Sequence, residues 1–564
     1  MYYDDALWIA STAAQEPIFL EPSMANRHGF ITGATGTGKT TTLKVMAESF
    51  SAIGVPVFMQ DIKGDLSGIC NPGEQTEKVE SRLDALGVPE WEDTGFPTRF
   101  WDIFGEEGHP IRVTISDMGP ALIARLLNLS DVQTGVLNLV FHIADEQGLL
   151  LLDLKDLRAM LSYCAEHRTE FTTDYGNMSP QSIGAIQRSL LTLEEQGGDV
   201  FFGEPGFNIE DFITTAEDGR GYINILNSKK LVQSPLLYST FLLWMLSELF
   251  EKLPEEGDSA IPKMVFFFDE AHLLFDDAPK AFLDKVVQIV KLIRSKGIGI
   301  YFISQSPADI PDAVLAQLQN RVQHALHAYT PAEQKAVKTA ATTFRPNPDF
   351  STEEAISLLG VGEALISFLD ENGVPAVVEK GKILPPQSFM APASAEIINE
   401  IITTDTDYEE LYRESYDRES AYEILMAQRQ EEEAQKQYEA EQKELEKLRK
   451  EQEKAERAAQ KEAAAALRQA EREAAARDRE RRRLESQMIR ELSKTVAPSR
   501  AAGRKSTTSS HAYTGYGYNG NTRTSSRSTT SRQTPPPPPP QDDFSDIGRA
   551  IGRTINRGLF GNRR

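Results

Sequence analysis

The sequence predicts an α/β fold with a mainly parallel sheet, a largely helical insertion, a long charged C-terminal helix and a disordered tail. Three observations predict it. Apolar runs rich in β-branched and aromatic residues alternate with helical patterns up to about residue 390. A glycine-rich loop, residues 33–42, joins one of these runs to a helical pattern. Beyond residue 390 the composition changes to charged, helix-forming residues.

The composition is that of a soluble chain long enough for more than one domain. Its 564 residues are 40% hydrophobic and 26% charged, and the formal net charge is −24. This acidic balance argues against a protein that coats nucleic acid by bulk attraction, although a local basic channel would be compatible with it. Cys70 and Cys164 lack the spacing of a zinc site or of a disulfide framework.

No segment has the pattern of a signal peptide or of a membrane span. The N-terminus carries Asp4 and Asp5 where a signal peptide would have basic residues. The most apolar helical stretch, residues 236–253, is interrupted by polar side chains, whereas a membrane span needs about 20 mostly apolar residues. We therefore expect a buried helix there, and a cytoplasmic protein without a membrane span.

The predicted strands of the core lie on both sides of a helical region. After a short run at 28–32, they are 55–61, 112–117, 221–226, 264–270, 297–305 and 321–329. Continuous apolar runs separated by helices are typical of a parallel sheet that is buried on both faces. Two alternating runs within 363–384 flank Glu371-Asn372-Gly373 and predict a closing hairpin. We assign 1–72 and 221–392 to the core, and 73–220 to a largely helical insertion with some strand at 111–117.

The C-terminal region divides into a helix and a tail. Residues 405–496 contain no glycine or proline and carry many opposite charges four residues apart. Their few large apolar residues hold no heptad, so a solvated single helix and a weak coiled coil both fit. Residues 497–564 are basic and Pro-rich, and we expect them to be disordered. This tail could bind nucleic acid, an anionic membrane surface or the acidic body, or it could only aid solubility. Residues 544–561 could form a short amphipathic helix on binding.

Residues 33–40 match the phosphate-loop pattern GxxxxGK[ST], called Walker A, at every fixed position. Glycines let successive backbone N–H groups turn toward a phosphate. We expect Lys39 to reach the β- and γ-phosphates of ATP and the Thr40 hydroxyl to bind Mg²⁺. The expected nucleotide-binding residues are Gly33, Ala34, Thr35, Gly36, Thr37, Gly38, Lys39, Thr40 and Thr41. A plain glycine-rich turn is the alternative.

An acidic pair, Asp269-Glu270, ends the predicted strand that begins at residue 264. At a strand end both side chains would lie in the crevice above a parallel sheet. We expect Asp269 to act through water on Mg²⁺ and Glu270 to activate the attacking water. His272 could relay the nucleotide state to a neighbouring surface. On their own, the two carboxylates would also fit a helix N-cap with a first-turn acid.

Other polar residues at strand ends have alternative interpretations. Gln305 ends the strand 297–305 and could contact the γ-phosphate or the attacking water, or simply cap the strand. Arg321 and Arg294 are rival candidates for an arginine that acts on the nucleotide of a neighbouring subunit, and an exposed salt bridge is the alternative for each. Asp61 or Asp65 could contact Mg²⁺-bound water or a partner subunit, although a tight turn explains the same residues.

With these motifs in place, the sequence resembles the HerA/FtsK superfamily of P-loop ATPases, and within it the YjgR-type group of HerA-like proteins. The resemblance covers roughly residues 15–390 and is carried by "NRHGFITGATGTGKT", "VPVFMQDIKGDLSG", "FFFDEAH", "YFISQSPADIP" and "LLGVGEALISFLDENGVPAVVEKGKILPP". It implies a RecA-like core, ATP hydrolysis with Mg²⁺, and hexameric rings with the nucleotide between subunits.

The resemblance can be carried over to single residues. Lys39 and Thr40 match its Walker A pair, and Asp269 and Glu270 match its Walker B pair. Gln305 matches the polar sensor, whereas Arg321 matches the trans arginine only approximately. HerA has a β-barrel before its P-loop, and here Gly33 lies too close to the N-terminus for such a domain, so a role in DNA repair is not implied.

Three functions are compatible with the sequence. The first is an oligomeric ATPase motor that acts on a polymer, most simply DNA. The second is an ATPase switch or scaffold that carries a protein partner on the helix 405–496. The third is a small-molecule kinase, which the adjacent Asp269 and Glu270 disfavour because they are suited to activating water.

Overall fold

The computed structural model describes residues 2–3, 6–175, 178–257, 259–275 and 280–492. The chain divides into two compact units, Met1–Glu451 and Gln452–Arg564. The tail expected to be disordered, 497–564, the amphipathic helix expected at 544–561 and the end of the helix expected over 405–496 lie outside the described residues.

A sheet of 13 strands forms the centre of the first unit. Its order is β1-β2-β13-β12-β11-β4-β10-β9-β5-β8-β6-β7, with β3 paired to β2. The stretch from β11 to β7 is parallel throughout, which confirms the predicted mainly parallel sheet. Its strands are β11 (Asn320–Gln323), β4 (Gly29–Thr32), β10 (Ile298–Ser304), β9 (Met264–Phe268), β5 (Val57–Asp61), β8 (Ile223–Asn227), β6 (Thr98–Asp102) and β7 (His109–Pro110).

Antiparallel strands extend the sheet beyond β11. They are β12 (Glu363–Ser367), β13 (Glu379–Ile383), β2 (Ala6–Ser11), β3 (Pro17–Leu20) and β1 (Tyr2–Tyr3). The pairing of β12 with β13 confirms the predicted closing hairpin. The N-terminal strands β2 and β3 are not predicted by the sequence pattern, although every residue of β2 is buried.

Both faces of the parallel sheet are covered, as strand β9 illustrates. Val265 and Phe267 pack into one buried cluster, together with helix α1 (Lys39–Ala52). Phe266 and Phe268 pack into a second cluster, which includes helix α9 (Pro235–Lys252). This double burial explains why the strands read as continuous apolar runs. The apolar stretch 236–253 therefore forms a buried helix, and among the described residues no helix is long and apolar enough to span a membrane.

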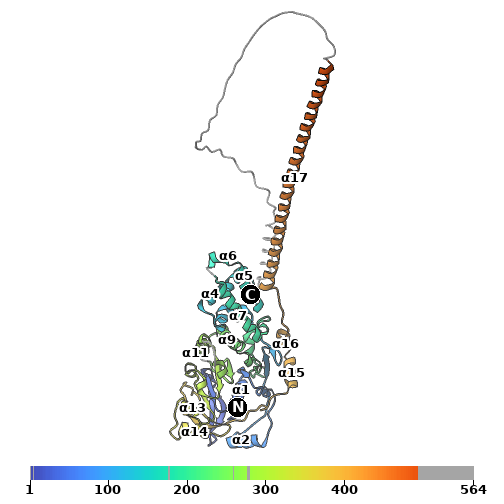
Figure 1. Cartoon of the computed structure of the whole chain (residues 1–564). Coiled ribbons are helices and arrows are strands. Elements are labelled where there is room, and N and C mark those ends of the chain that lie inside the picture. The colour runs from blue at the N-terminus through green and yellow to red at the C-terminus, as the bar shows by residue number, and fades with distance from the viewer. Residues whose placement is uncertain (1, 4–5, 176–177, 258, 276–279, 493–564) are drawn as a thin grey trace, which may run out of the picture. The chain divides into compact units, whose positions relative to one another are not determined.

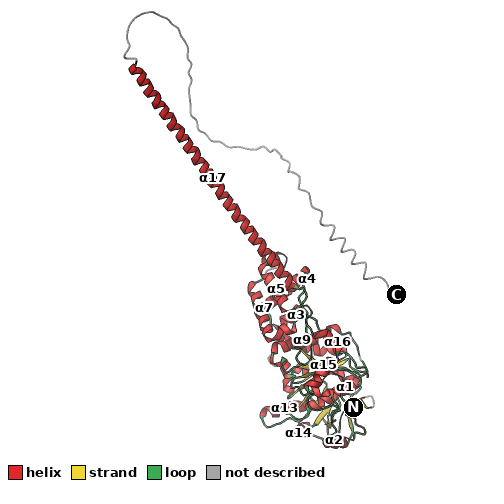
Figure 2. Ribbon diagram, turned by 90° about the vertical axis from the view of Figure 1, so that its right-hand side faces the viewer, coloured by secondary structure: helices red, strands yellow, loops and turns green. Residues whose placement is uncertain are grey.

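The helical region lies between β7 and β8 in the sequence. Figure 1 shows α4, α5 and α7 gathered at the end of the first unit away from α13 and α14, and Figure 2 shows that this end is almost entirely helical. Its helices are α3 (Ile115–Leu126), α4 (Asp131–Gln147), α5 (Leu154–Glu166), α6 (Arg168–Tyr175), α7 (Pro180–Leu193) and α8 (Asp199–Phe201). Side chains of Ser130 and Asp153 cap α4 and α5.

Two expectations for this region need correction. The strand expected at 111–117 is wrong, because α3 begins at Ile115 and Val113 makes only an isolated bridge to Phe202. Thr114 caps that helix by accepting a hydrogen bond from the backbone N–H of Asp117, 3.0 Å away, and this ends the extended segment. In addition, β6 lies within the range expected for the insertion but pairs with β8 of the main sheet.

The remaining helices surround the sheet or follow it. They are α2 (Glu77–Leu86), α10 (His272–Phe275), α11 (Lys280–Leu292), α12 (Asp312–Leu315), α13 (Pro331–Thr342), α14 (Thr352–Leu358), α15 (Ala395–Thr404), α16 (Thr406–Tyr412) and α17 (Ala421–Leu492). The predicted long helix thus begins at Ala421, because residues 406–412 belong to the separate helix α16. Its start is fixed by Asp156, whose carboxylate accepts hydrogen bonds from the Ser420 hydroxyl (2.5 Å) and the Tyr422 backbone N–H (2.9 Å).

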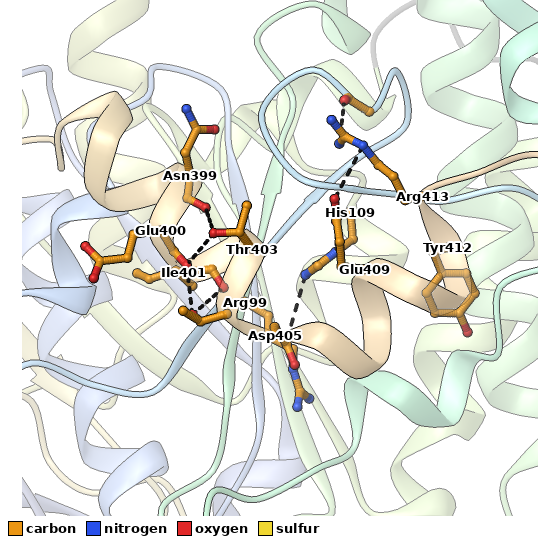
Figure 3. Close-up of polar contacts among 12 residues, drawn as sticks. Arg99, His109, Asn399, Glu400, Ile401, Thr403, Asp405, Glu409, Tyr412 and Arg413 are labelled. Atoms are coloured by element: carbon orange, nitrogen blue, oxygen red, sulfur yellow. Dashed lines mark hydrogen bonds and ion pairs between the residues drawn. The ribbon is translucent and has the colours of Figure 1, made fainter.

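Helices α15 and α16 form a strap, residues 395–412, that packs along the sheet edge formed by β6 and β7 (Figure 3). Arg99 of β6 donates to the Asp405 carboxylate at 2.7 Å and lies between the rings of Tyr222 and Tyr408, 3.7 and 4.2 Å from their centroids. His109 of β7 lies 3.2 Å from a carboxylate oxygen of Glu409. The strap therefore covers the edge with buried, charge-assisted contacts.

Candidate active site

The phosphate loop lies where β4 ends and α1 begins, as the sequence predicts. Gly36 and Gly38 have φ values of +77° and +117°, a backbone conformation that side chains with a Cβ rarely adopt. Helix α1 begins at Lys39, so the backbone N–H groups of Lys39, Thr40 and Thr41 have no acceptor within the helix. Together with the positive end of the helix dipole, they form an anion-binding site.

Neighbouring segments brace this loop through its backbone. The N–H of Ala34 donates to the carbonyl of Ala325 at 2.8 Å, and the N–H of Gly362 donates to the carbonyl of Thr37 at 2.9 Å. Arg82 of α2 in turn donates to the carbonyl of Gly362 at 2.6 Å. The loop is thus held between β11 and the segment that leads into β12, which keeps its N–H groups in place for a ligand.

His324, directly after β11, packs under the loop and is fully buried. Its Nδ1 lies 3.0 Å from the carbonyl of Glu363, and its Nε2 lies 2.8 Å from the Thr42 hydroxyl. A carbonyl only accepts, so Nδ1 carries the proton and Nε2 accepts from Thr42. Burial lowers the pKa of His324 to about 4, and nearby Lys39 adds to this shift. The imidazole is therefore a neutral support that connects β11 to the first turns of α1.

Lys39 lies inside the loop that it completes. Its ammonium donates to the carbonyls of Gly33 (2.7 Å) and Ala34 (3.2 Å). Burial lowers the pKa of Lys39, and the charges of Glu270 and Asp269 oppose that shift. The amine is thus positioned as a point charge at the mouth of the loop, which is the placement that its expected contact with phosphate requires.

The sheet places the other polar candidates at the same edge as the loop. Strands β5, β9, β10 and β4 are consecutive parallel neighbours. Ser304 is level with Thr32, so Gln305 follows at the level of Gly33. Phe267 is level with Met59, so Asp269 is level with Asp61. The carboxyl ends of parallel strands therefore bring Asp269, Glu270 and Gln305 together beside the phosphate loop.

Asp269 is a buried carboxylate at the end of β9, 8% exposed. One of its oxygens accepts a hydrogen bond from the Glu270 backbone N–H at 2.9 Å. Burial raises the pKa of Asp269 to about 6, with Lys63 opposing and Glu270 adding to the shift. A carboxylate and the Thr40 hydroxyl are hard oxygen donors of the kind that Mg²⁺ prefers, so these residues fit that ion, and a divalent cation would favour the ionised form of Asp269.

Glu270 has an unusual backbone and a crowded carboxylate. Its φ is +46°, a strained value for a residue other than glycine. One carboxylate oxygen lies 2.6 Å from the Lys63 ammonium; the other lies 3.4 Å from the Gln305 amide and 3.5 Å from His272 Nδ1. Burial raises the pKa of Glu270, but the hydrogen bond and charge of Lys63 outweigh it, and the net shift is downward. Glu270 is therefore ionised at neutral pH.

The two candidate arginines are not brought to the loop. Arg321 is half-buried, and its guanidinium donates to the backbone carbonyls of Leu318 (3.0 Å), Thr343 (2.9 Å) and Leu315 (3.3 Å). These contacts favour a structural role within its own chain. Arg294 lies in the turn before β10. This turn is at the amino ends of the parallel strands, whereas the phosphate loop is at their carboxyl ends.

The turn after β5 contains the remaining candidates. Asp61 accepts from the backbone N–H groups of Gly64 (2.6 Å) and Leu66 (3.2 Å), which is the tight-turn arrangement. The sequence does not predict two contacts of this site, Lys63 with Glu270 and His324 with Thr42. Lys63 and His324 each follow shortly after a strand whose carboxyl end lies beside the phosphate loop. This position is the only sequence signal that could have indicated the two contacts.

A braced phosphate loop between a parallel strand and a helix, with a carboxylate pair two strands away, is the arrangement of a P-loop nucleotide-binding core on an α/β sheet. More narrowly, the chain belongs to the helicase HerA-like C-terminal family, whose sequence profile matches residues 7–506.

Solved structures and curated sequences complete the comparison. The plasmid coupling protein TrwB in complex with ADP and Mg²⁺ has 14% identity and a TM-score of 0.47, over 70% of this chain and 93% of that chain. VirB4 of Thermoanaerobacter pseudethanolicus has 15% identity and a TM-score of 0.43, over 68% of this chain and 97% of that chain. No curated protein matches the chain in sequence.

Proposed function

We propose that this chain hydrolyses ATP in a Mg²⁺-dependent reaction, with Glu270 as the residue that activates water. The observation that carries the proposal is the position of Glu270: it follows buried Asp269 at the edge of the sheet where the phosphate loop lies, and its carboxylate belongs to the charge network around Lys39. A carboxylate at such a position suits the orientation of water better than the transfer of a phosphoryl group to a metabolite.

Each residue has a defined task in this proposal. The loop N–H groups and Lys39 bind the phosphates, while Thr40 and Asp269 hold Mg²⁺, Asp269 through water. The ion, when bound, would supply positive charge to the phosphate oxygens. Glu270 accepts the proton of the attacking water, and Gln305, whose amide lies 3.4 Å from Glu270, helps to orient that water.

We further propose that hydrolysis drives a motor that acts on DNA or another polymer, with the chain assembled as a hexameric ring. Membership of the helicase HerA-like C-terminal family supports this proposal. The net charge of −24 limits DNA contact to a local surface or to the basic tail. In such a ring an arginine of a neighbouring subunit would complete the site, and the internal contacts of Arg321 favour a different arginine for that task.

A nucleotide-controlled switch or scaffold is the second candidate, and α17 favours it. The helix is 72 residues long. Its large apolar side chains, which are suited to a helical partner, are exposed: Leu445 (53%), Leu448 (51%), Leu484 (58%) and Met488 (66%). In this case a protein partner would bind α17, and hydrolysis would control that assembly without translocation along DNA.

Phosphate release tests these proposals. The purified full chain would be assayed with ATP and Mg²⁺, alone and with single- or double-stranded DNA, beside Glu270→Gln and the exposed control Glu251→Gln. A motor predicts release that DNA stimulates, whereas a scaffold predicts slow release that DNA does not change. Glu270→Gln should lower the rate by about 10²-fold or more, and Glu251→Gln should not. Wild-type protein that releases no phosphate in any condition would contradict the ATPase proposal.

A further inference from the structure

Lys63 is the residue of the site whose contact the proposed reaction does not explain. It lies in the turn after β5, and its ammonium is 2.6 Å from one carboxylate oxygen of Glu270. The turn is rigid, because Asp61 accepts two of its backbone N–H groups. Gly64 has a φ of +81°, a left-handed conformation that residues with a Cβ rarely adopt. The backbone therefore holds Lys63 opposite Glu270.

The carboxylate of Glu270 is occupied on both sides. Lys63 takes one oxygen, and the other faces the Gln305 amide at 3.4 Å and His272 Nδ1 at 3.5 Å. A general base must offer an oxygen to the water whose proton it accepts. The shortest and strongest of these contacts is the charge-assisted one to Lys63, so this contact competes most directly with a water molecule.

The two partners differ in their freedom to move. The Glu270 side chain is 10% exposed, and its backbone is constrained by the φ of +46° and by the N–H contact to Asp269. The Lys63 side chain is 51% exposed and has a flexible four-carbon stem. Release of the pair is therefore a movement of the Lys63 side chain, and it leaves Glu270 in place.

We propose that Lys63 is a positioning residue that restrains Glu270 in a resting state, and that water activation begins when its ammonium leaves the carboxylate. This inference rests on the proposed ATPase function and adds a control to the same site. An anion that enters the crevice, such as the terminal phosphate of a nucleotide, is the chemical group suited to compete for the ammonium. The restraint limits hydrolysis as long as the phosphate of the bound nucleotide has not taken the ammonium from Glu270.

Basal phosphate release by Lys63→Met, Lys63→Arg and the exposed control Lys78→Met tests the restraint, with KM and Tm measured for each. Lys63→Met should raise kcat roughly two- to fivefold, the rate equivalent of a half-exposed ion pair, with KM and Tm unchanged. Lys63→Arg keeps a cation opposite Glu270 and should stay near wild type, as should Lys78→Met. A Lys63→Met enzyme that is no faster than an active wild type overturns the restraint and leaves the ATPase proposal intact. If neither wild type nor Lys63→Met releases phosphate, the ATPase proposal is contradicted, and the proposed restraint with it.

A second measurement does not depend on activity. The nucleotide-free chain would be acetylated with a limiting amine reagent and the modification of Lys63 quantified by mass spectrometry, with Lys78 as internal reference. Glu270→Gln removes the partner carboxylate, so Lys63 should be modified about twofold or more faster than in wild type while Lys78 is unchanged. Equal modification of Lys63 in both proteins would show that the pair does not hold Lys63 in solution, and it would overturn the proposal.

Discussion

The imidazole of His324 and the hydroxyl of Thr42 share a 2.8 Å hydrogen bond between the end of β11 and the second turn of α1. The same ring donates to the carbonyl of Glu363, so one buried side chain connects three segments around the phosphate loop. Replacing His324 should therefore affect both the stability of the fold and the binding of nucleotide.

We expect His324→Ala to lower the free energy of unfolding by about 2–4 kcal/mol, because it leaves a cavity and removes a hydrogen-bond partner from both Thr42 and the carbonyl of Glu363. It should also weaken the binding of a fluorescent ATP analogue, since the loop loses its support. Denaturant unfolding and analogue titration would measure these effects. His327→Ala, an exposed change three residues further along, is the matched control. Full affinity in a destabilised His324→Ala protein would mean that the loop is held by its backbone contacts alone.

Buried histidines, among them His28 and His324, predict sensitivity to acid. His28 donates from Nε2 to the carbonyl of Val290 (2.8 Å) and accepts at Nδ1 from the N–H of Ile300 (3.0 Å). Burial lowers the pKa of His28 and of His324 to about 4, below the about 6.5 of an unfolded histidine. As the pH falls, the unfolded chain binds these protons first. The stability contribution is thus complete above pH about 6.5 and is lost as the pH falls toward 4.

Thermal unfolding between pH 7 and pH 4 would measure this loss. His28→Gln removes one of these titrating groups, so its Tm should fall less steeply over this range even if it starts lower. His142→Gln, at an exposed position on α4, should keep the wild-type slope. A slope for His28→Gln that is the same as that of wild type would exclude His28 as a source of the acid sensitivity.

Because Arg321 contacts carbonyls of its own chain, we expect its replacement to affect stability. An arginine that acts on a neighbouring subunit would instead affect hydrolysis. Arg321→Ala would remove the guanidinium donor from the carbonyls of Leu315, Leu318 and Thr343, so we expect about 2–4 kcal/mol of destabilisation. In rings assembled from Arg321→Ala and Lys39→Ala subunits, we expect no recovery of hydrolysis. Recovery in rings shown to be mixed would restore Arg321 as the residue that acts across the subunit boundary.

Arg99 predicts how firmly the strap is attached. Its side chain is 8% exposed and pairs with Asp405 at 2.7 Å (Figure 3). Its guanidinium also stacks on the rings of Tyr222 and Tyr408. Truncating one partner of such a buried pair costs about 3–5 kcal/mol, so Arg99→Ala should lower the free energy of unfolding by that amount. Arg413→Ala, one residue after the strap, removes an exposed pair with Glu409 and should stay within about 0.5 kcal/mol of wild type. Similar unfolding free energies for the two variants would contradict a stabilising role of the strap.

The success of sequence-based prediction here depends on how local each feature is. The parallel strands are predicted because burial on both faces selects uninterrupted apolar runs, and the phosphate loop because each of its fixed positions has a steric or ionic reason. Strand β6 ("TRFWD") is missed because Thr98, Arg99 and Asp102 make it polar, and the groups that pair with Arg99 are distant in sequence. The strand expected at 111–117 fails because a local cap at Thr114 outweighs β-propensity.

The same reasoning applies within the site. Asp269 and Glu270 are predicted because they adjoin a recognisable strand. The pairing of Lys63 with Glu270 joins residues 207 positions apart, and that of His324 with Thr42 joins residues 282 apart. Nothing in the local pattern selects these partners, and only the order of strands in the folded sheet brings them together.

The strap also determines whether the sheet edge at β6 and β7 is accessible to another molecule. An uncovered parallel edge presents backbone donors and acceptors that can pair with the same edge of another molecule. In this chain α16 contacts β7, with His109 beside Glu409. Proteolytic cleavage before Ala395, or premature termination of translation there, would therefore produce a chain that retains its phosphate loop but tends to self-associate through β6 and β7. The truncated chain would then leave the soluble fraction by aggregation, although its phosphate loop is intact.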